Sequence, residues 1–183
     1  MINYYIQTSK AALLPVLFIA NLCAHTPVSA ADTPHPQSHG FLALSLGYYD
    51  VFDEPDGVDA RIEYRPQTNI IIDELKPWLG IEATSQGSLW GGGGLLYNLD
   101  ISDKLRLTPS LGLGLYTKGG SDIDLDSLLQ FKTQIEASYK LKSESRIGLS
   151  LSHMSNGSLG NSNPGTEVIS INYQIPLNQL YEK

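Results

Sequence analysis

From Phe41 onward, apolar side chains recur at every second position in eight successive segments, and this period constrains the fold more than any other feature of the chain. A period of two is that of a β-strand with two different faces, and helical periodicity is nearly absent. The rows cover residues 42–48, 58–64, 77–83, 89–99, 105–115, 129–141, 147–155 and 167–175. We therefore expect an all-β protein built from eight strands.

The second face of each row is polar or charged, as Arg61 and Glu63 illustrate. Eight strands of about nine to twelve residues with one apolar face fit an eight-stranded antiparallel transmembrane β-barrel of the outer membrane, whose apolar band faces lipid. In a barrel of this size side chains fill the interior, so we expect a network of paired charges rather than a pore. Aromatic residues near the ends of the rows favour the same fold because aromatic girdles mark both membrane interfaces. They are Tyr48, Tyr64, Tyr97, Tyr139 and Tyr173.

A lipocalin-like soluble barrel is the alternative that the period alone leaves open. It would place the leucines inside and the charged face in solvent. Pro109 and the glycines of residues 91–94 would leave such a core thinly packed, whereas lipid tolerates an uneven wall. The sequence therefore favours the membrane barrel.

Residues 1–30 have the features of a secretory signal peptide, with Lys10 as the one charge and Val28-Ser29-Ala30 as the cleavage site. We expect residues 31–183 to form a single domain, with 31–40 as a periplasmic tail. Cys23 is the one cysteine and lies in the signal, so the mature chain has neither a catalytic thiol nor a disulfide. Its 12 − 1 = 11 basic residues against 19 acidic ones argue against nucleic acid as a partner.

A serine, a histidine and a glutamate share the apolar face of the last two predicted strands. His153 and Ser155 continue the row of Leu151, and Glu167 begins the row of Ile169. His153 can remove the proton of the Ser155 hydroxyl, and Glu167 can orient the imidazole if the two strands pair in the matching register. This combination predicts an ester hydrolase whose site opens onto lipid.

The connection between these strands contains Asn161-Ser162-Asn163-Pro164-Gly165, which is typical of a tight turn with Gly165 at a positive dihedral angle. Asn156 and Asn163, together with the backbone amides of residues 157–158, are candidate donors to the oxyanion of an acyl-transfer intermediate.

The strand count also predicts sidedness. If both termini lie in the periplasm, residues 157–166 lie outside, and His153, Ser155 and Glu167 sit at the level of the outer leaflet. Residues 67–75 are then periplasmic, and Ile70-Ile71-Ile72 predicts a short amphipathic turn or helix there.

The pattern His-x-Ser-Asn-x-Ser followed by Asn-Pro-Gly and Glu, at the end of a barrel of this size, resembles the outer-membrane lipid A 3-O-deacylases, the PagL family. The resemblance implies that Ser155 is the nucleophile, His153 the general base and Glu167 the third member of a triad. It implies oxyanion or positioning roles for Asn156 and Asn163. The implied reaction is calcium-independent hydrolysis of the ester-linked acyl chain at position 3 of lipid A, with release of a 3-hydroxy fatty acid and no cofactor or metal.

Two other functions stay open at this point: a non-enzymatic outer-membrane barrel for adhesion or membrane integrity, and an esterase or phospholipase with another substrate. The expected partners are lipopolysaccharide and outer-membrane lipids, and the sequence leaves open whether the barrel forms a homodimer. Residues 91–94 predict close backbone packing or a groove for an acyl chain. Asp122, Asp124 and Asp126 favour a solvated loop over a specific site for the cations that bridge lipopolysaccharide.

Overall fold

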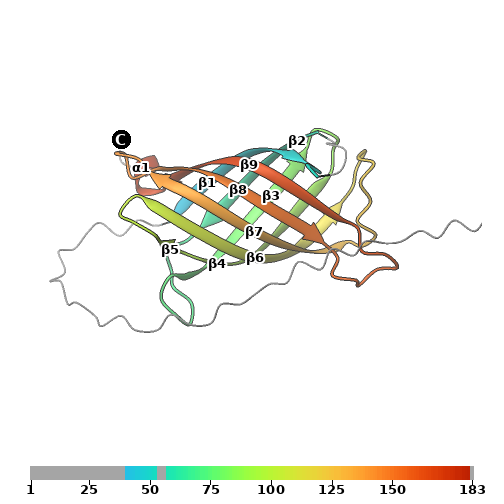
Figure 1. Cartoon of the computed structure of the whole chain (residues 1–183), viewed down its shortest axis with the longest axis horizontal. Helices are drawn as coiled ribbons and strands as arrows, with labels where there is room; N and C mark the ends of the chain where they lie inside the picture. The colour runs from blue at the N-terminus through green and yellow to red at the C-terminus, as the bar shows by residue number, and fades with distance from the viewer. Residues whose placement is uncertain (1–39, 53–56, 182–183) are drawn as a thin grey trace, which may run out of the picture. The chain divides into compact units, whose positions relative to one another are not determined.

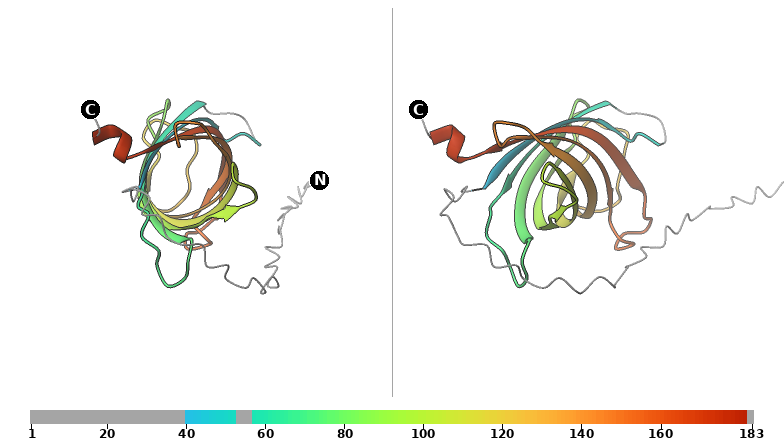
Figure 2. Two further views of the ribbon diagram at one scale, coloured as in Figure 1. Left: turned by 90° about the vertical axis from the view of Figure 1, so that its left-hand side faces the viewer. Right: turned by 60° about the vertical axis from the view of Figure 1, so that its left-hand side comes forward.

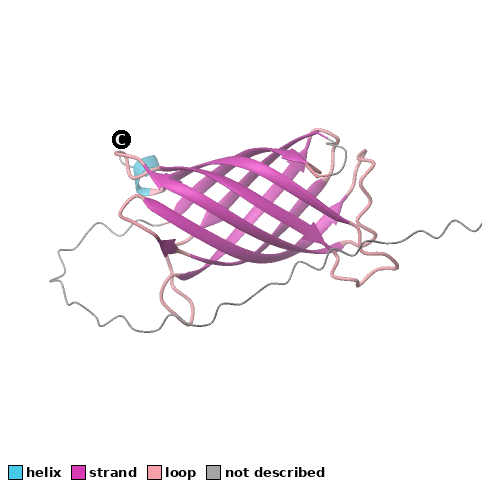
Figure 3. Cartoon of the chain, viewed as in Figure 1, coloured by secondary structure: helices cyan, strands magenta, loops and turns pink. Residues whose placement is uncertain are grey.

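Nearly all of the regular secondary structure in the described chain is strand (Figure 3). The structure is a computed structural model that describes residues 40–52 and 57–181, so the predicted signal peptide and the predicted tail up to residue 39 lie outside the described residues. The strands are β1 (Phe41–Tyr49), β2 (Gly57–Arg65), β3 (Leu75–Thr84), β4 (Leu89–Tyr97), β5 (Leu99–Asp100), β6 (Leu105–Thr117), β7 (Leu129–Lys140), β8 (Arg146–Ser155) and β9 (Gly165–Pro176), followed by the short helix α1 (Asn178–Tyr181). No helix within these ranges is long and apolar enough to cross a bilayer.

The sheet closes on itself, as the view along the barrel shows (Figure 2). Neighbouring strands pair antiparallel in the order β4-β3-β2-β1-β9-β8-β7-β6, and the additional pairing of β4 with β6 completes the ring. Eight long strands therefore form the wall, which confirms the prediction from the alternation. β5 is a two-residue addition that pairs with β6, and the period predicts neither β5 nor α1.

The inner and outer faces of the wall differ in chemistry. Arg61 is 1% exposed and Glu136 is fully buried, and both lie inside the barrel. Leu149 and Ile171 are 59% and 60% exposed on the outer surface. A soluble barrel would show the opposite distribution, so the lipocalin-like alternative is wrong and this wall faces lipid. Four of the predicted interfacial tyrosines are likewise exposed: Tyr48, Tyr64, Tyr139 and Tyr173.

Charged side chains pair with one another inside the barrel, which confirms the predicted network. Arg65 lies 3.0 Å from Glu136. Glu82 lies 3.4 Å from Arg61 and also contacts the ammonium of Lys132. A buried charge is costly unless it is paired and hydrogen-bonded, so these contacts make a polar interior compatible with a stable fold.

Glycines line the seam where β4 meets β6, and two tryptophans lie over them. The rings of Trp78 and Trp90 stack with centroids 5.9 Å apart. A Cβ atom on Gly114 would lie 2.5 Å from the Trp90 ring, and one on Gly92 would lie 2.3 Å from the Leu113 carbonyl oxygen. Only glycine permits so close an approach, so close backbone packing explains the inward-facing glycines of β4.

The two ends of the barrel carry different connections (Figure 1). Phe41 pairs with Pro176, so β1 begins where β9 ends, and we call this the terminal end. The connections after β1, β3, β6 and β8 gather at the opposite end, which we call the distal end. At the terminal end, the predicted amphipathic segment is a turn closed by a bridge between Ile70 and Ile72, and not a helix.

The interior network predicts a large cost for removing its central carboxylate. We expect Glu82→Ala to lower the free energy of unfolding by about 3–5 kcal/mol, because Arg61 and Lys132 would stay buried without their shared partner. Urea unfolding in lipid vesicles, followed by tryptophan fluorescence, measures this change. The control is Asp100→Ala, which removes a 55% exposed partner of Arg106 and should cost less than about 1 kcal/mol. Equal losses in the two variants would contradict the role given to the interior pairs.

Candidate active site

The β8–β9 register brings the predicted histidine and glutamate together. His153 stands directly opposite Glu167 across the two strands. The His153 Nδ1 atom lies 2.8 Å from the Glu167 Oε1 atom. The His153 side chain is 46% exposed and the Glu167 side chain is 23% exposed, so both are accessible from outside the barrel. The matching register that the sequence required is thus present, and it leaves the Nε2 edge of the imidazole available for a second partner.

Ser155 occupies the next outward position of β8, at the distal end of the strand. Its cross-strand neighbours are Phe131 on β7 and Gly165 on β9. Below it, the outward row continues through His153 to Leu151, which is exposed on the apolar wall. The three predicted reactive side chains therefore share one outer face, near the edge of the apolar band.

Gly165 makes room for the imidazole. A Cβ atom at this position would lie 2.5 Å from the His153 Cε1 atom and 3.3 Å from the Nε2 atom. The ring therefore lies against the glycine that stands directly opposite Ser155. Among the hydrogen bonds of the described residues there is none between His153 and Ser155, and catalytic hydrogen bonds are often long before substrate binds.

The turn prediction for Gly165 is wrong in its dihedral angle. Gly165 is the first residue of β9 and is not among the glycines with a positive φ. Two residues of the connection do have a positive φ, Gly157 at 60° and Ser158 at 67°. The reversal of the chain thus begins directly after Asn156, and Gly165 is needed for space rather than for backbone freedom.

Asn156 points into the barrel end and is fully buried. Its Nδ2 atom donates to the Leu125 carbonyl at 2.9 Å and to the Ser162 carbonyl at 2.8 Å, and its Oδ1 atom accepts from the Ser158 N–H at 2.8 Å. Both N–H groups of the amide are engaged within the protein, so donation to an oxyanion would require one of these two hydrogen bonds to break. Asn163 is exposed within the connection.

The backbone N–H of Gly157 has no hydrogen-bond partner among the described residues. Gly157 is the first of two successive residues in the left-handed conformation. In such a bend, neighbouring backbone N–H groups point toward the same side of the chain, where they can bind a negatively charged oxygen. Its neighbour Ser158 already donates to Asn156, so of these two amides Gly157 is the free one. Gly157 lies two residues beyond Ser155, within the bend from which the sequence predicts oxyanion donors.

Carboxylates gather in the connection after β6. The Asp124 carboxylate lies 3.2 Å from the Lys118 ammonium, and the Asp126 backbone N–H together with Lys118 holds the pKa of Asp124 below its ordinary value. Asp122 is exposed. Within residues 40–52 and 57–181, no group of three or more histidine, cysteine and acidic side chains is arranged to hold a metal ion.

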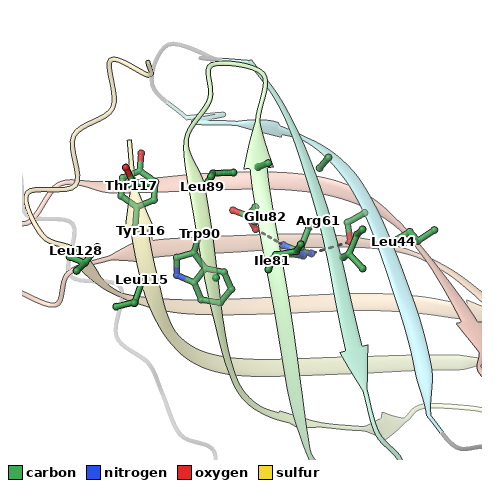
Figure 4. Close-up of a pocket in the computed structure, with 15 residues that line it drawn as sticks. Leu44, Arg61, Ile81, Glu82, Leu89, Trp90, Leu115, Tyr116, Thr117 and Leu128 are labelled. Carbon is green, nitrogen blue, oxygen red and sulfur yellow. Dashed lines mark hydrogen bonds and ion pairs between the residues drawn. The ribbon is translucent and has the colours of Figure 1, made fainter. Parts of the chain in front are cut away.

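A hollow of about 700 Å³ lies in another part of the wall, across β1 to β4 and β6 (Figure 4). Its lining is mainly apolar and includes Leu44, Ile81 and Leu115, with the small residues Ala60 and Gly91 between larger ones. None of the predicted reactive residues lines this hollow. The predicted reactive residues therefore lie on an exposed part of the wall, outside this hollow.

Solved structures of similar fold are membrane barrels. The crystal structure of the outer membrane enzyme PagL matches with a TM-score of 0.57 and 21% identity, covering 74% of this chain and 99% of that chain. A de novo designed transmembrane β-barrel matches with a TM-score of 0.53 and 12% identity, covering 78% and 100%. Neisserial surface protein A matches with a TM-score of 0.51 and 12% identity, covering 74% and 94%. At these identities the likeness shows the fold.

Among curated proteins, nothing matches the chain. One protein family does: the model of the lipid A 3-O-deacylases (PagL) matches residues 61–176. This stretch contains most of the barrel wall and all three predicted reactive residues, His153, Ser155 and Glu167. The chain belongs to the lipid A 3-O-deacylase (PagL) family.

Proposed function

We propose that this protein is an outer-membrane serine esterase that hydrolyses the acyl ester at position 3 of lipid A. The observation that carries the proposal is the 2.8 Å contact between His153 and Glu167 on the lipid-facing wall, one outward position from Ser155. Membership of the family points to lipid A as the substrate. The position of the bond and the serine mechanism are the parts that the proposal adds.

In the proposed reaction, the Ser155 Oγ atom attacks the ester carbonyl while the His153 Nε2 atom takes the hydroxyl proton. Glu167 accepts from Nδ1–H, which fixes the tautomer and stabilises the imidazolium. His153 then returns the proton to the departing sugar hydroxyl, and an acyl-serine remains. Water, deprotonated by the same imidazole, hydrolyses this acyl-serine and releases the 3-hydroxy fatty acid.

The tetrahedral intermediate places a negative charge on the former carbonyl oxygen. The free N–H of Gly157 is the donor that we assign to this oxygen. Removal of one such donor from a comparable site costs about 10²–10³-fold in rate. Asn156 acts indirectly, because its buried side chain holds the bend that presents the Gly157 amide. Asn163 is assigned a positioning role at the exposed side of the connection.

The site would meet its substrate from the side, within the membrane. We place the terminal end in the periplasm, so that the distal end and Ser155 lie at the outer leaflet. Acyl chains would then lie along the apolar wall beside Leu151 and Ile169, while the sugars stay level with the distal connections. Polar side chains are tolerated near the ends of a barrel wall far better than at its midplane, which suits this depth.

Mass spectrometry of lipid A tests the reaction and the nucleophile together. A host with an outer membrane should lose one hydroxyacyl mass from its lipid A when it expresses the wild-type chain, and lose none when it expresses Ser155→Ala. Ser143→Ala is the matched control, because Ser143 is an exposed serine in the connection after β7, at the terminal end of the barrel, and should leave activity intact. If folded wild-type protein leaves lipid A unchanged, the function lies with another ester or with a non-enzymatic barrel.

A second prediction concerns the space beside the imidazole. We expect Gly165→Ala to lower kcat by about 100-fold, because the new methyl group would overlap His153 and displace the ring from Ser155. Gly91→Ala is the control: it faces outward on β4, and its nearest neighbour, an Ile81 carbon, would be 3.8 Å away. Deacylation kinetics with purified, folded variants measure both. Unchanged kcat in Gly165→Ala would contradict the assigned position of the ring.

A further inference from the structure

The connection after β6 is bonded directly to the connection that carries the proposed active site. One oxygen of Asp126, Oδ2, accepts from the Ser162 backbone N–H at 2.6 Å and from the Ser162 hydroxyl at 3.1 Å. Gly160 packs against the same carboxylate, and a Cβ atom there would lie 2.7 Å from Oδ2. At 2.6 Å, the contact between the Ser162 N–H and the Asp126 carboxyl group has the short distance typical of strong hydrogen bonds.

Ser162 is held from its other side as well. Its carbonyl accepts from Asn156 Nδ2 at 2.8 Å, and the same nitrogen donates to the Leu125 carbonyl at 2.9 Å. Asn156 directly follows Ser155 in the chain. The connection after β8 is thereby fixed at its beginning by Asn156 and near its end by Asp126, and both contacts lead to residues 118–128.

Residues 118–128 are themselves anchored to the barrel. Leu125 is fully buried and packs in a cluster with Tyr116 and Met154. The Tyr116 hydroxyl donates to the Ile123 carbonyl at 2.9 Å, and Gln130 Nε2 donates to the Ser127 carbonyl at 2.6 Å. A segment tied to the wall in this way can act as a fixed support for its neighbour.

From these contacts we propose that Asp126 is a positioning residue of the deacylase. Its carboxylate fixes the backbone around Ser162, and this in turn fixes the bend that presents the Gly157 amide and the start of β9 against which His153 lies. Asp126 does not touch the reacting atoms; it determines where the groups that do so are held. The proposal rests on the proposed function, because it assigns Asp126 a role in the same site.

Two other acidic residues of the same segment provide the contrast. Asp122 is exposed, and Asp124 pairs with Lys118 and not with the connection after β8. All three residues carry the same charge in the same connection, so a general electrostatic effect on an anionic substrate would be shared among them. A positioning effect would be confined to Asp126.

The experiment compares Asp126→Ala with Asp126→Asn, Asp122→Ala and Asp124→Ala as folded barrels in detergent. We expect Asp126→Ala to lower kcat by about 10–100-fold with little change in KM, since ground-state binding to the wall is retained. Asp126→Asn keeps an oxygen that can accept from the Ser162 N–H and should recover most of the activity. Asp122→Ala and Asp124→Ala should behave like the wild type.

Two further readouts separate positioning from general destabilisation and from failure of the proposed function. The first is the rate at which an alkyl fluorophosphonate labels Ser155, which depends on the nucleophile and the oxyanion donors but not on lipid A as substrate. The second is the midpoint of thermal unfolding. Slower labelling of Asp126→Ala with an unchanged midpoint supports the proposal, even if lipid A is not the substrate.

The proposal is overturned if Asp126→Ala labels and deacylates at the wild-type rate. It is also overturned if all three alanine variants lose activity equally, which would indicate a shared charge effect. A loss that follows the fraction of unfolded protein, with normal labelling of the folded fraction, would overturn it by showing a purely structural role.

Discussion

Closure of the sheet between β4 and β6 is the constraint on which the rest of the structure depends. A lipid core offers no partner for an open strand edge, so every backbone group in the wall must find its partner within the ring. Eight strands leave a narrow interior, and glycines such as Gly92 and Gly114 let the seam close over the two tryptophans. Charged residues that face this interior are buried, and Arg61 and Glu82 offset that cost by pairing with each other.

The same constraint decides where chemistry can occur. The interior is occupied by side chains and by paired charges, so a lipid cannot reach a site there. The outer face is open to lipid, and antiparallel pairing places opposite residues of neighbouring strands side by side. His153 and Glu167 meet on this face because the β8–β9 register sets them opposite each other, and Ser155 joins them through the period of two.

Periodicity explains which features the sequence could predict. The eight strands, their faces and the pairing of His153 with Glu167 all follow from a repeat of two and a tight return. The inward direction of Asn156 also follows, because it is one residue beyond the outward Ser155, and this signal argues against an oxyanion role for its side chain. The space that Gly165 leaves for the imidazole depends on a rotamer, and the bond from Ser162 to Asp126 joins two connections that have no period. The alternation of apolar and polar residues therefore predicts neither the space at Gly165 nor the hydrogen bond between Ser162 and Asp126.

The candidate site lies at the boundary between the apolar wall and the distal connections, and these two parts of the barrel differ in chemistry. Ser155 ends β8 and Glu167 lies near the start of β9, so the polar groups stand where the apolar band gives way to the distal connections. Below them the outer wall is mainly apolar, with Leu151 and Ile169 exposed. Above them, residues 118–128 and the connection after β8 are hydrogen-bonded to each other. With Ser155 at the outer leaflet, as we propose, an ester at the junction of acyl chain and sugar lies at this level, and the rest of the acyl chain lies deeper. In the proposed reaction, selection of the bond can therefore arise from the height at which the barrel holds Ser155, with the hydrogen-bonded connections after β6 and β8 keeping that height constant.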